Sequence, residues 1–152
     1  MPQSLRIRPA QPADVAAVEA CVREAYALYI PRIGREPAPM TVDYAELVAG
    51  GEVWVAAEGE AVVGVLVLRP KPGSLFLENV AVAPARQGSG IGSALLRFAE
   101  EQAEGLGLRE VTLYTNEAMT ENLSFYPARG YEELERRFDE GFHRVFFRKR
   151  LA

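Results

Sequence analysis

The chain has 152 residues, of which 49% are hydrophobic and 25% are charged, so it contains enough apolar sequence for one sizeable core. We therefore expect one domain spanning residues 1–152. The formal net charge of −4 argues against a nucleic-acid partner, because phosphate backbones require a basic protein face. The sequence has neither a membrane-spanning apolar run nor a signal-peptide segment, which makes a cytoplasmic protein without a membrane partner the default expectation.

A strand and a helix are expected first. Residues 5–8 alternate apolar and basic side chains, as a half-buried strand does. An apolar stripe at helical spacing follows, made of Val15, Val18, Val22, Ala25 and Tyr29. Cys21, the one cysteine of the sequence, lies beside this stripe, so we interpret it as a core residue rather than a nucleophile and expect no internal disulfide.

Residues 30–40 are expected to form an irregular loop, because they contain three prolines and a glycine. Thr41 is then expected to cap a short helix that reaches Leu47 and Val48. Asp43 would lie in the first turn of this helix, where a negative charge is favourable.

The middle of the chain predicts three consecutive antiparallel strands. Residues 52–57 and 61–69 are rich in β-branched side chains, and residues 58–60, Glu-Gly-Glu, join them as a hairpin turn would. A second turn over residues 71–74 leads into a strand over residues 75–83.

The following glycine turn and helix are the most informative stretch of the chain. Gly88, Gly90 and Gly92 lack a Cβ atom, which lets the backbone turn tightly and approach a ligand closely. Helical apolar periodicity starts within this turn and predicts a helix over residues 91–106. The first N–H groups and the positive dipole end of that helix would point into the turn, so an anion is its natural occupant. A strand over residues 111–115 should then run parallel to the strand before the turn.

Several kinds of nucleotide site consist of a strand, a glycine turn and a helix, and the residue pattern of the turn distinguishes them. A Walker-type loop ends in Gly-Lys-Ser/Thr, and this turn holds no lysine. A dinucleotide fingerprint has a glycine where Ser93 stands here. Residues 87–92, Gln-Gly-Ser-Gly-Ile-Gly, match the pattern Q/R-x-x-G-x-G/A. This segment resembles the one with which the GNAT superfamily of acyl-CoA-dependent N-acyltransferases holds the coenzyme A pyrophosphate. The plain alternative is a glycine-rich surface turn.

A second stretch resembles the same superfamily in order and distance. Asn122 stands four residues before Tyr126, Phe125 precedes that tyrosine, and Gly130 and Tyr131 follow it. The resemblance implies an α/β (α+β) fold with a mixed, mainly antiparallel sheet of about seven strands, about four helices and splayed central strands. It also implies acetyl-CoA as co-substrate. No metal is expected, because the one histidine of the sequence, His143, cannot form a metal cluster.

By the same resemblance, the coenzyme would be held by the strand before the glycine turn, by the turn itself and by the second motif. The implied coenzyme-binding residues are Val80, Ala81, Val82, Arg86, Gln87, Gly88, Ser89, Gly90, Ile91, Gly92, Ser93, Asn116, Asn122 and Tyr126.

The resemblance also implies two catalytic residues. Tyr126 matches the tyrosine beside the sulfur, where a phenol can protonate the departing thiolate. Glu78 is the candidate general base, on the expectation that it shares a strand face with Phe76, Val80 and Val82. Glu78 could instead pair with an arginine, and a water molecule could relay the proton. Pro127 departs from the family pattern and puts the aim of the Tyr126 phenol in question.

The sequence predicts direct attack in a ternary complex, because no cysteine or serine stands in a nucleophile context. The acceptor is expected to be a small primary amine, which the chain would bind as a monomer or homodimer. The acceptor-binding residues would come from the proline-rich segment and are Tyr29, Arg32, Glu36 and Met40. Asp43 would add negative charge, and Arg32 and Arg35 could instead hold a carboxylate. The alternatives are a non-catalytic acyl-CoA-binding or regulatory domain and an acetyltransferase of protein N-termini or lysines.

Overall fold

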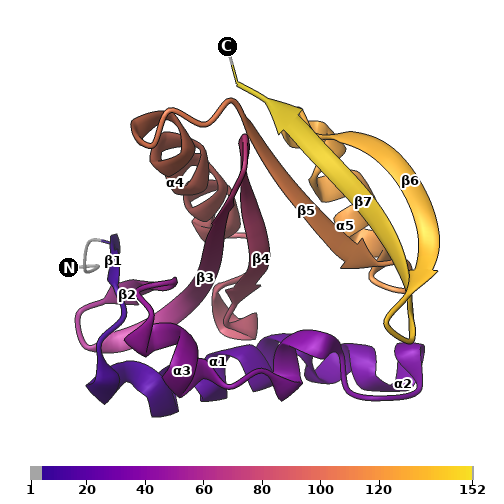
Figure 1. The fold of residues 1–152 in the computed structure, drawn as a ribbon. Coiled ribbons are helices and arrows are strands. Elements are labelled where there is room, and N and C mark those ends of the chain that lie inside the picture. The colour runs from indigo at the N-terminus through magenta and orange to yellow at the C-terminus, as the bar shows by residue number, and fades with distance from the viewer. Residues whose placement is uncertain (1–4, 152) are drawn as a thin grey trace.

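The computed structural model describes residues 5–151 and contains a seven-stranded sheet with the strand order β1-β2-β3-β4-β5-β7-β6 (Figure 1). The strands are β1 Leu5–Pro9, β2 Val53–Glu58, β3 Ala61–Lys71, β4 Ser74–Val82, β5 Glu110–Asn116, β6 Glu132–Asp139 and β7 Phe142–Arg150. Neighbouring strands are antiparallel except β4 and β5, which run parallel. This topology confirms the predicted mixed, mainly antiparallel sheet.

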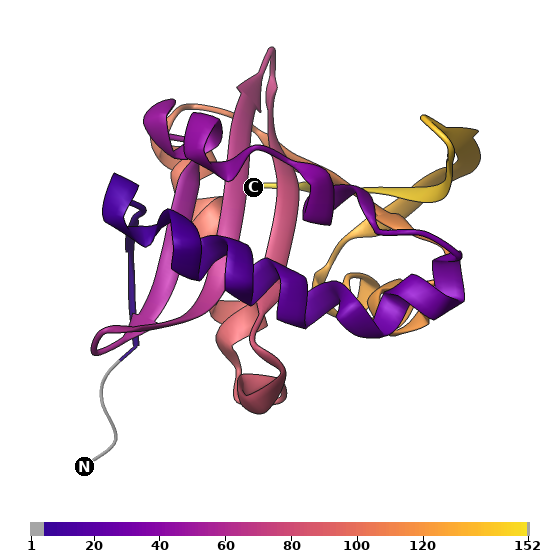
Figure 2. The same cartoon turned by 90° about the horizontal axis from the view of Figure 1, so that it is seen from below.

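Helices cover both faces of this sheet. The α-helices are α1 Val15–Tyr26, α2 Ile30–Ile33, α3 Tyr44–Ala49, α4 Ile91–Gly105 and α5 Thr120–Phe125. Helices α1 and α3 pack on one face, where α1 crosses β3 and β4, while α4 and α5 pack on the other (Figures 1 and 2). Apart from the single turn of α2, these are the four predicted helices. Among the helices of residues 5–151, none combines the length and apolar composition that a bilayer span requires.

Each face has its own apolar core. Val18 and Val22 of α1 are buried against Val65 and Val67 of β3 on one face. On the other face Leu95 of α4 is fully buried, and truncation of such a residue to alanine typically costs about 2–5 kcal/mol. The two cores hold the glycine turn, which joins β4 to α4, in a fixed position relative to the sheet.

The segment between α1 and α3 is more regular than predicted. Residues 27–29 form a 3₁₀ turn and α2 follows directly, so the expectation of an irregular loop from residue 30 is wrong in its first part. Pro31 is compatible with α2 because it lies in the first turn, where its missing N–H has no helical partner. Gly34 ends this helix in the left-handed conformation, with φ 86°, and its N–H donates to the Ile30 carbonyl at 2.8 Å.

The cap of α3 is Asp43 rather than the predicted Thr41. The Asp43 carboxylate accepts a hydrogen bond from the Glu46 N–H at 3.2 Å, as an N-cap does. The Thr41 hydroxyl instead donates to the Ala38 carbonyl at 2.9 Å, within a preceding 3₁₀ turn over Ala38–Thr41. The helix therefore begins two residues later than a Thr41 cap would allow.

A β-bulge in β4 changes which face its side chains occupy. Val67 pairs with Asn79 and Leu68 pairs with Leu77, so Glu78 is the extra residue between them. Leu77 before the bulge and Val80 after it both pack in the core under α4, whereas Asn79 turns to the face under α1. The expectation that Glu78 shares one face with Phe76, Val80 and Val82 is therefore wrong, because the bulge interrupts the two-residue period.

Strands β4 and β5 also separate beyond the bulge. They pair only where Leu75–Leu77 lies beside Val111–Leu113, and their carboxyl ends then diverge (Figure 1). This divergence is the predicted splay of the central strands. It leaves the end of β4 open on one side, next to α5 and the glycine turn.

Candidate active site

A groove of about 450 Å³ lies between the end of β4, the glycine turn and α5. Most of the residues predicted to bind the coenzyme line it: Val80, Ala81, Val82, Arg86, Gln87, Gly88, Gly90, Gly92, Ser93, Asn122 and Tyr126. Three of the predicted residues do not. Ile91 is buried in the core under α4, the Ser89 hydroxyl bonds to the Arg86 carbonyl, and Asn116 lies in a neighbouring cavity.

The glycine turn forms one end of the groove. Gly88 and Gly90 adopt left-handed conformations, with φ of 81° and 90°, which side chains with a Cβ rarely tolerate. Gly90 is the N-cap of α4 and supplies no capping side chain, so the first N–H groups of the helix are left without a capping partner. These donors and the helix dipole favour a bound phosphate at the end of the groove.

Arg129 adds a positive charge beside this helix terminus. Its Nε donates to the Ser93 hydroxyl at 2.8 Å and its Nη1 donates to the Phe125 carbonyl at 2.9 Å. Its guanidinium lies 3.7 Å from the centre of the Phe125 ring, which holds it against α5. Sequence reasoning missed Arg129, although its position directly before Gly130 in the second motif was a usable signal.

Behind the groove lies a smaller cavity of about 40 Å³, here called the inner cavity, which extends to Glu78, Tyr114 and Arg144. Four residues line both the groove and the inner cavity: Tyr26, Val80, Asn122 and Tyr126. A thioester at the inner end of the groove would therefore meet a group that enters from the inner cavity. Tyr126 stands at that junction.

Tyr126 keeps a helical backbone in spite of the proline that follows it. Its φ and ψ are −72° and −46°, and Pro127 starts a separate 3₁₀ turn, in which no proline N–H is needed. The ring packs against Tyr131 and Phe147, at centroid distances of 5.8 and 5.7 Å. Within residues 5–151 the Tyr126 hydroxyl has no hydrogen-bond partner, which leaves it available to a ligand. Burial raises the pKa of Tyr126 far above its ordinary value, so the phenol is protonated at neutral pH.

A buried chain of hydroxyl and amide groups supports the junction from the α1 face. The Tyr26 hydroxyl lies 2.5 Å from Asn79 Oδ1 and 3.0 Å from the Val80 carbonyl. Asn79 Nδ2 donates to the Tyr44 hydroxyl at 3.0 Å, and that hydroxyl donates to the Pro39 carbonyl. These hydrogen bonds hold the peptide group that follows the bulge in place. These residues were not predicted, because the bulge that turns Asn79 toward Tyr26 has no sequence signature.

Glu78 lines the inner cavity and forms an ion pair with an arginine. Its carboxylate lies 3.2 Å from Arg69 Nη1, and Arg69 Nε lies 2.9 Å from Glu52. The side chain of Glu78 retains 21% of its exposure. The structure thus contains the arginine pairing that was the alternative interpretation of Glu78, and it also keeps this carboxylate beside the space from which an acceptor would arrive.

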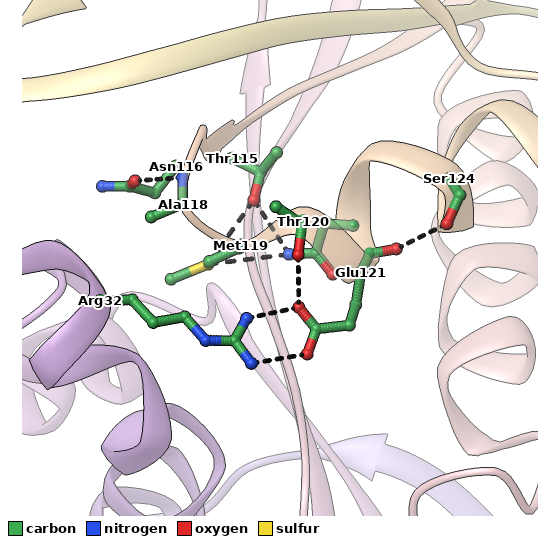
Figure 3. Close-up of polar contacts among 9 residues, drawn as sticks. Arg32, Thr115, Asn116, Ala118, Met119, Thr120, Glu121 and Ser124 are labelled. Carbon is green, nitrogen blue, oxygen red and sulfur yellow. Dashed lines mark hydrogen bonds and ion pairs between the residues drawn. The ribbon is translucent and has the colours of Figure 1, made fainter.

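The residues predicted to bind the acceptor do not gather at one place. Tyr29 lines the groove, Met40 packs against the core under α1, and Glu36 is exposed and lines none of the three cavities described here. Arg32 lines a third cavity of about 260 Å³, the outer cavity, but forms a bidentate ion pair with Glu121 of α5 at 2.7 and 3.2 Å (Figure 3). Arg32 therefore ties α2 to α5.

The same view shows how α5 is attached to the end of β5. Asn122 Nδ2 donates to the Thr115 hydroxyl at 2.9 Å. That hydroxyl lies 3.6 Å from Met119 Sδ (Figure 3). Asn116 caps the turn between them by accepting from the Ala118 N–H at 2.9 Å. The amide of Asn122 thus sets the position of the helix that carries Tyr126.

The described part of the chain, residues 5–151, contains no group of three or more His, Cys, Asp or Glu side chains arranged to hold a metal ion.

Residues 18–131 match the model of the family described as "Acetyltransferase (GNAT) family". The chain is 32% identical over 103 residues to N-acetyltransferase 8F1 of Rattus norvegicus, an alignment that covers 64% of this chain and 47% of the rat protein. The chain spans about half the length of the curated relatives it matches, between 40% and 61%.

Solved structures resemble the whole fold. The PaiA N-acetyltransferase of Thermoplasma acidophilum, solved with coenzyme A, is similar with a TM-score of 0.80 and 17% identity, over 97% of this chain and 99% of that one. An acetyltransferase of Thermus thermophilus has a TM-score of 0.77 and 21% identity, over 99% of this chain and 100% of that one. At these identities the likeness establishes the fold.

Proposed function

Because the chain belongs to the GNAT acetyltransferase family, we propose that it transfers an acetyl group from acetyl-CoA to a primary amine. The observation that carries the proposal is the shared wall of the groove and the inner cavity. Tyr26, Val80, Asn122 and Tyr126 line both spaces, so a donor in one and an acceptor in the other would meet at these residues. Bringing two reactants together in this way is itself a large part of the rate enhancement that acyl transfer requires.

The groove has the features that coenzyme A requires. Its volume of about 450 Å³ lies within the range of pockets that bind cofactors. The N–H groups at the start of α4 would hold the pyrophosphate, and Arg129 would supply a positive charge beside it. The open edge of β4 at Val80–Val82 would bond the pantetheine arm, because β5 has already separated from it there.

The chemistry follows from the groups at the junction. The thioester carbonyl is polarised by main-chain N–H groups at the end of β4, and Tyr126 donates its proton to the departing thiolate. Glu78, directly or through a water molecule, removes a proton from the acceptor's ammonium and so frees the amine to attack. The second proton, which the nitrogen loses as the thiolate departs, returns to the Tyr126 oxygen. The amine attacks the thioester directly, in a ternary complex. Cys21 takes no part, because it is buried in the core under α1.

The proposal has two competitors. A non-catalytic acyl-CoA-binding domain would keep the groove and the glycine turn but transfer nothing. An acetyltransferase of protein N-termini or lysines would use the same junction but take a peptide. The inner cavity of about 40 Å³ favours a small acceptor, because its walls admit only a few atoms beside the thioester.

Two measurements test the proposal. Calorimetry with coenzyme A should show a single saturable site, and release of free thiol from acetyl-CoA should require an added amine. A panel of small primary amines, polyamines and short peptides identifies the class of acceptor. Coenzyme binding without thiol release for any member of the panel would support the non-catalytic competitor, and turnover of peptides alone would support the second.

A further inference from the structure

A buried arginine lines the inner cavity and is not used by the steps above. Arg144 of β7 retains 4% of its exposure. Its guanidinium lies 4.1 Å from the centre of the Tyr114 ring and 5.6 Å from that of Phe142. Both rings also line the cavity, so Arg144 and the two rings form one wall of it. Placing a cation there is costly unless its donors are bonded.

The donors of Arg144 are only partly bonded. Nη1 lies 3.0 Å from Asp139 and 3.9 Å from Glu140, both near the turn between β6 and β7. Within the described residues, 5–151, Nε and Nη2 have no hydrogen-bond partner. A buried guanidinium that lines a cavity and has donors without a partner is a site for an anion, and its planar fork suits a carboxylate in particular.

The two charges of the cavity lie on different walls. Glu78 comes from the bulge of β4, and Arg144 comes from β7 on the far side of β5. Tyr126 closes the end toward the groove. A molecule whose ammonium lies near Glu78 and the thioester, and whose carboxylate binds Arg144, would pair with both charges at once.

The other arginines near the acceptor path are less suited to this task. Arg32 is already bonded to Glu121 through two nitrogens. Arg35 is exposed, lies over the Phe142 ring at 4.3 Å from its centre, and lines the outer cavity. Of these three, Arg144 is the buried one, and it lines the cavity that adjoins the groove.

We propose that the acceptor is a primary amine that also carries a carboxylate, of the amino-acid class, and that Arg144 binds this carboxylate and thereby determines specificity. The inference rests on the proposed function. The inner cavity takes the amine and the carboxylate, and the rest of the acceptor extends past Asn116 and Phe142, which line both the inner and the outer cavity. The outer cavity, of about 260 Å³, has room for a side chain.

The test compares amines that differ only in the carboxylate: an amino acid, its amide and the amine left after decarboxylation. For the wild-type protein, kcat/KM should be at least about tenfold higher for the amino acid. Arg144→Gln should raise the KM for the amino acid by roughly 10- to 100-fold, the usual value of a hydrogen bond to a charged group. The KM for acetyl-CoA and the kcat/KM for the decarboxylated amine should not change. Arg144→Lys should recover part of the loss, because it keeps the charge without the fork.

Arg148→Gln is the matched control. Arg148 lies on the same strand, pairs with Glu132 outside the three cavities, and should leave all acceptor constants unchanged. Equal kcat/KM for the amino acid and its decarboxylated amine in the wild-type protein would overturn the inference without any variant. It would also be overturned by an Arg144→Gln variant that binds coenzyme A normally and keeps the wild-type amino-acid KM.

A binding measurement separates this inference from the proposed function. Amino acids and their decarboxylated amines are titrated into the protein saturated with coenzyme A. Carboxylate-dependent binding that Arg144→Gln abolishes, together with no turnover of any amine, would uphold the carboxylate site and reject the acetyl transfer. Turnover of amines with no carboxylate preference would reject this inference and leave the acetyl transfer standing.

Discussion

Tyr126 can be tested as a single hydroxyl group, because its ring is held by packing that does not involve the oxygen. Tyr126→Phe keeps the contacts with Tyr131 and Phe147 and removes only the proton donor. We expect kcat to fall by on the order of 10²-fold, the lower end of general acid–base contributions, with coenzyme A affinity nearly unchanged. Steady-state kinetics and calorimetry measure the two quantities. If chemistry is rate-limiting and kcat does not change, Tyr126 is not the general acid and contributes only by packing.

Arg129 is expected to act on coenzyme affinity alone. Arg129→Gln removes the charge beside the start of α4 while leaving an amide that can reach Ser93. The dissociation constant for coenzyme A should rise by about tenfold or more, and the effect should shrink as salt is added, because the lost term is electrostatic. Calorimetry at low and high ionic strength measures this. Equal coenzyme A affinity of wild type and variant at low salt would contradict a role of Arg129 in binding the phosphate.

Cys21 provides a pH-dependent signal that is independent of the active site. Burial raises the pKa of its thiol to about 11, with the Glu24 carboxylate adding to the effect. Because the folded-state pKa is raised, the associated stability is present at neutral pH and is lost as the pH rises from about 9 through 11. At pH 8 a thiol reagent should therefore modify the unfolded chain rapidly and the native protein slowly. Rapid modification of the native protein would contradict the burial of Cys21.

Among the single residues, those that stand in a local sequence motif could be predicted. Gly88, Gly90 and Tyr126 were identified because each stands in a short motif with a physical role. Tyr26 and Arg144 were not identified, because they reach the inner cavity from a helix and a strand that are distant in the sequence. No spacing within the sequence indicates that residues from α1 and β7 line the same cavity.

Among the elements, the turn before α4 carries the coenzyme assignment. Gly90→Ala and Gly90→Asp both place a Cβ on a residue whose φ is 90°, so both variants strain the backbone in the same way. In neither variant does that Cβ meet an atom within 4 Å. They differ in a carboxylate placed beside the free N–H groups of α4. We expect both variants to fold with a similar loss of stability and Gly90→Asp to bind coenzyme A far more weakly than Gly90→Ala. Thermal unfolding and calorimetry compare the pair. Equal coenzyme affinity of the two variants would contradict a phosphate at this turn.

Strand and helix assignments from periodicity succeeded where the period is uninterrupted. The hairpin of β2 and β3, the glycine turn and α4 all follow from local sequence, and the structure contains them. Periodicity failed at Glu78, where the bulge shifts the faces of β4, and at α3, where Asp43 competes with Thr41 for the cap. In both cases neighbouring elements decide between local alternatives of similar energy.

For the whole molecule, the fold explains why the site lies at the centre of the sheet. The parallel pairing of β4 and β5 ends after Leu77, which gives the sheet one internal opening between two packed cores. The sequence could predict that opening only through the family resemblance, since nothing in the composition of β4 and β5 specifies where their pairing stops. Residues of β7 and of the segment between α1 and α3 line the inner and outer cavities, but two predicted residues of that segment, Glu36 and Met40, line neither.

Single-turnover transfer from acetyl-CoA labelled in its acetyl group tests the central claim most directly. The protein, in excess over the labelled donor, is mixed with the amine that the acceptor panel identifies, and the label is followed by mass spectrometry on the amine and on the intact protein. We predict that the label appears on the amine in an amount equal to the thiol released, and at no time on the protein. Label on the protein before the amine, or thiol release without an acetylated amine, would contradict direct transfer at the junction of the groove and the inner cavity.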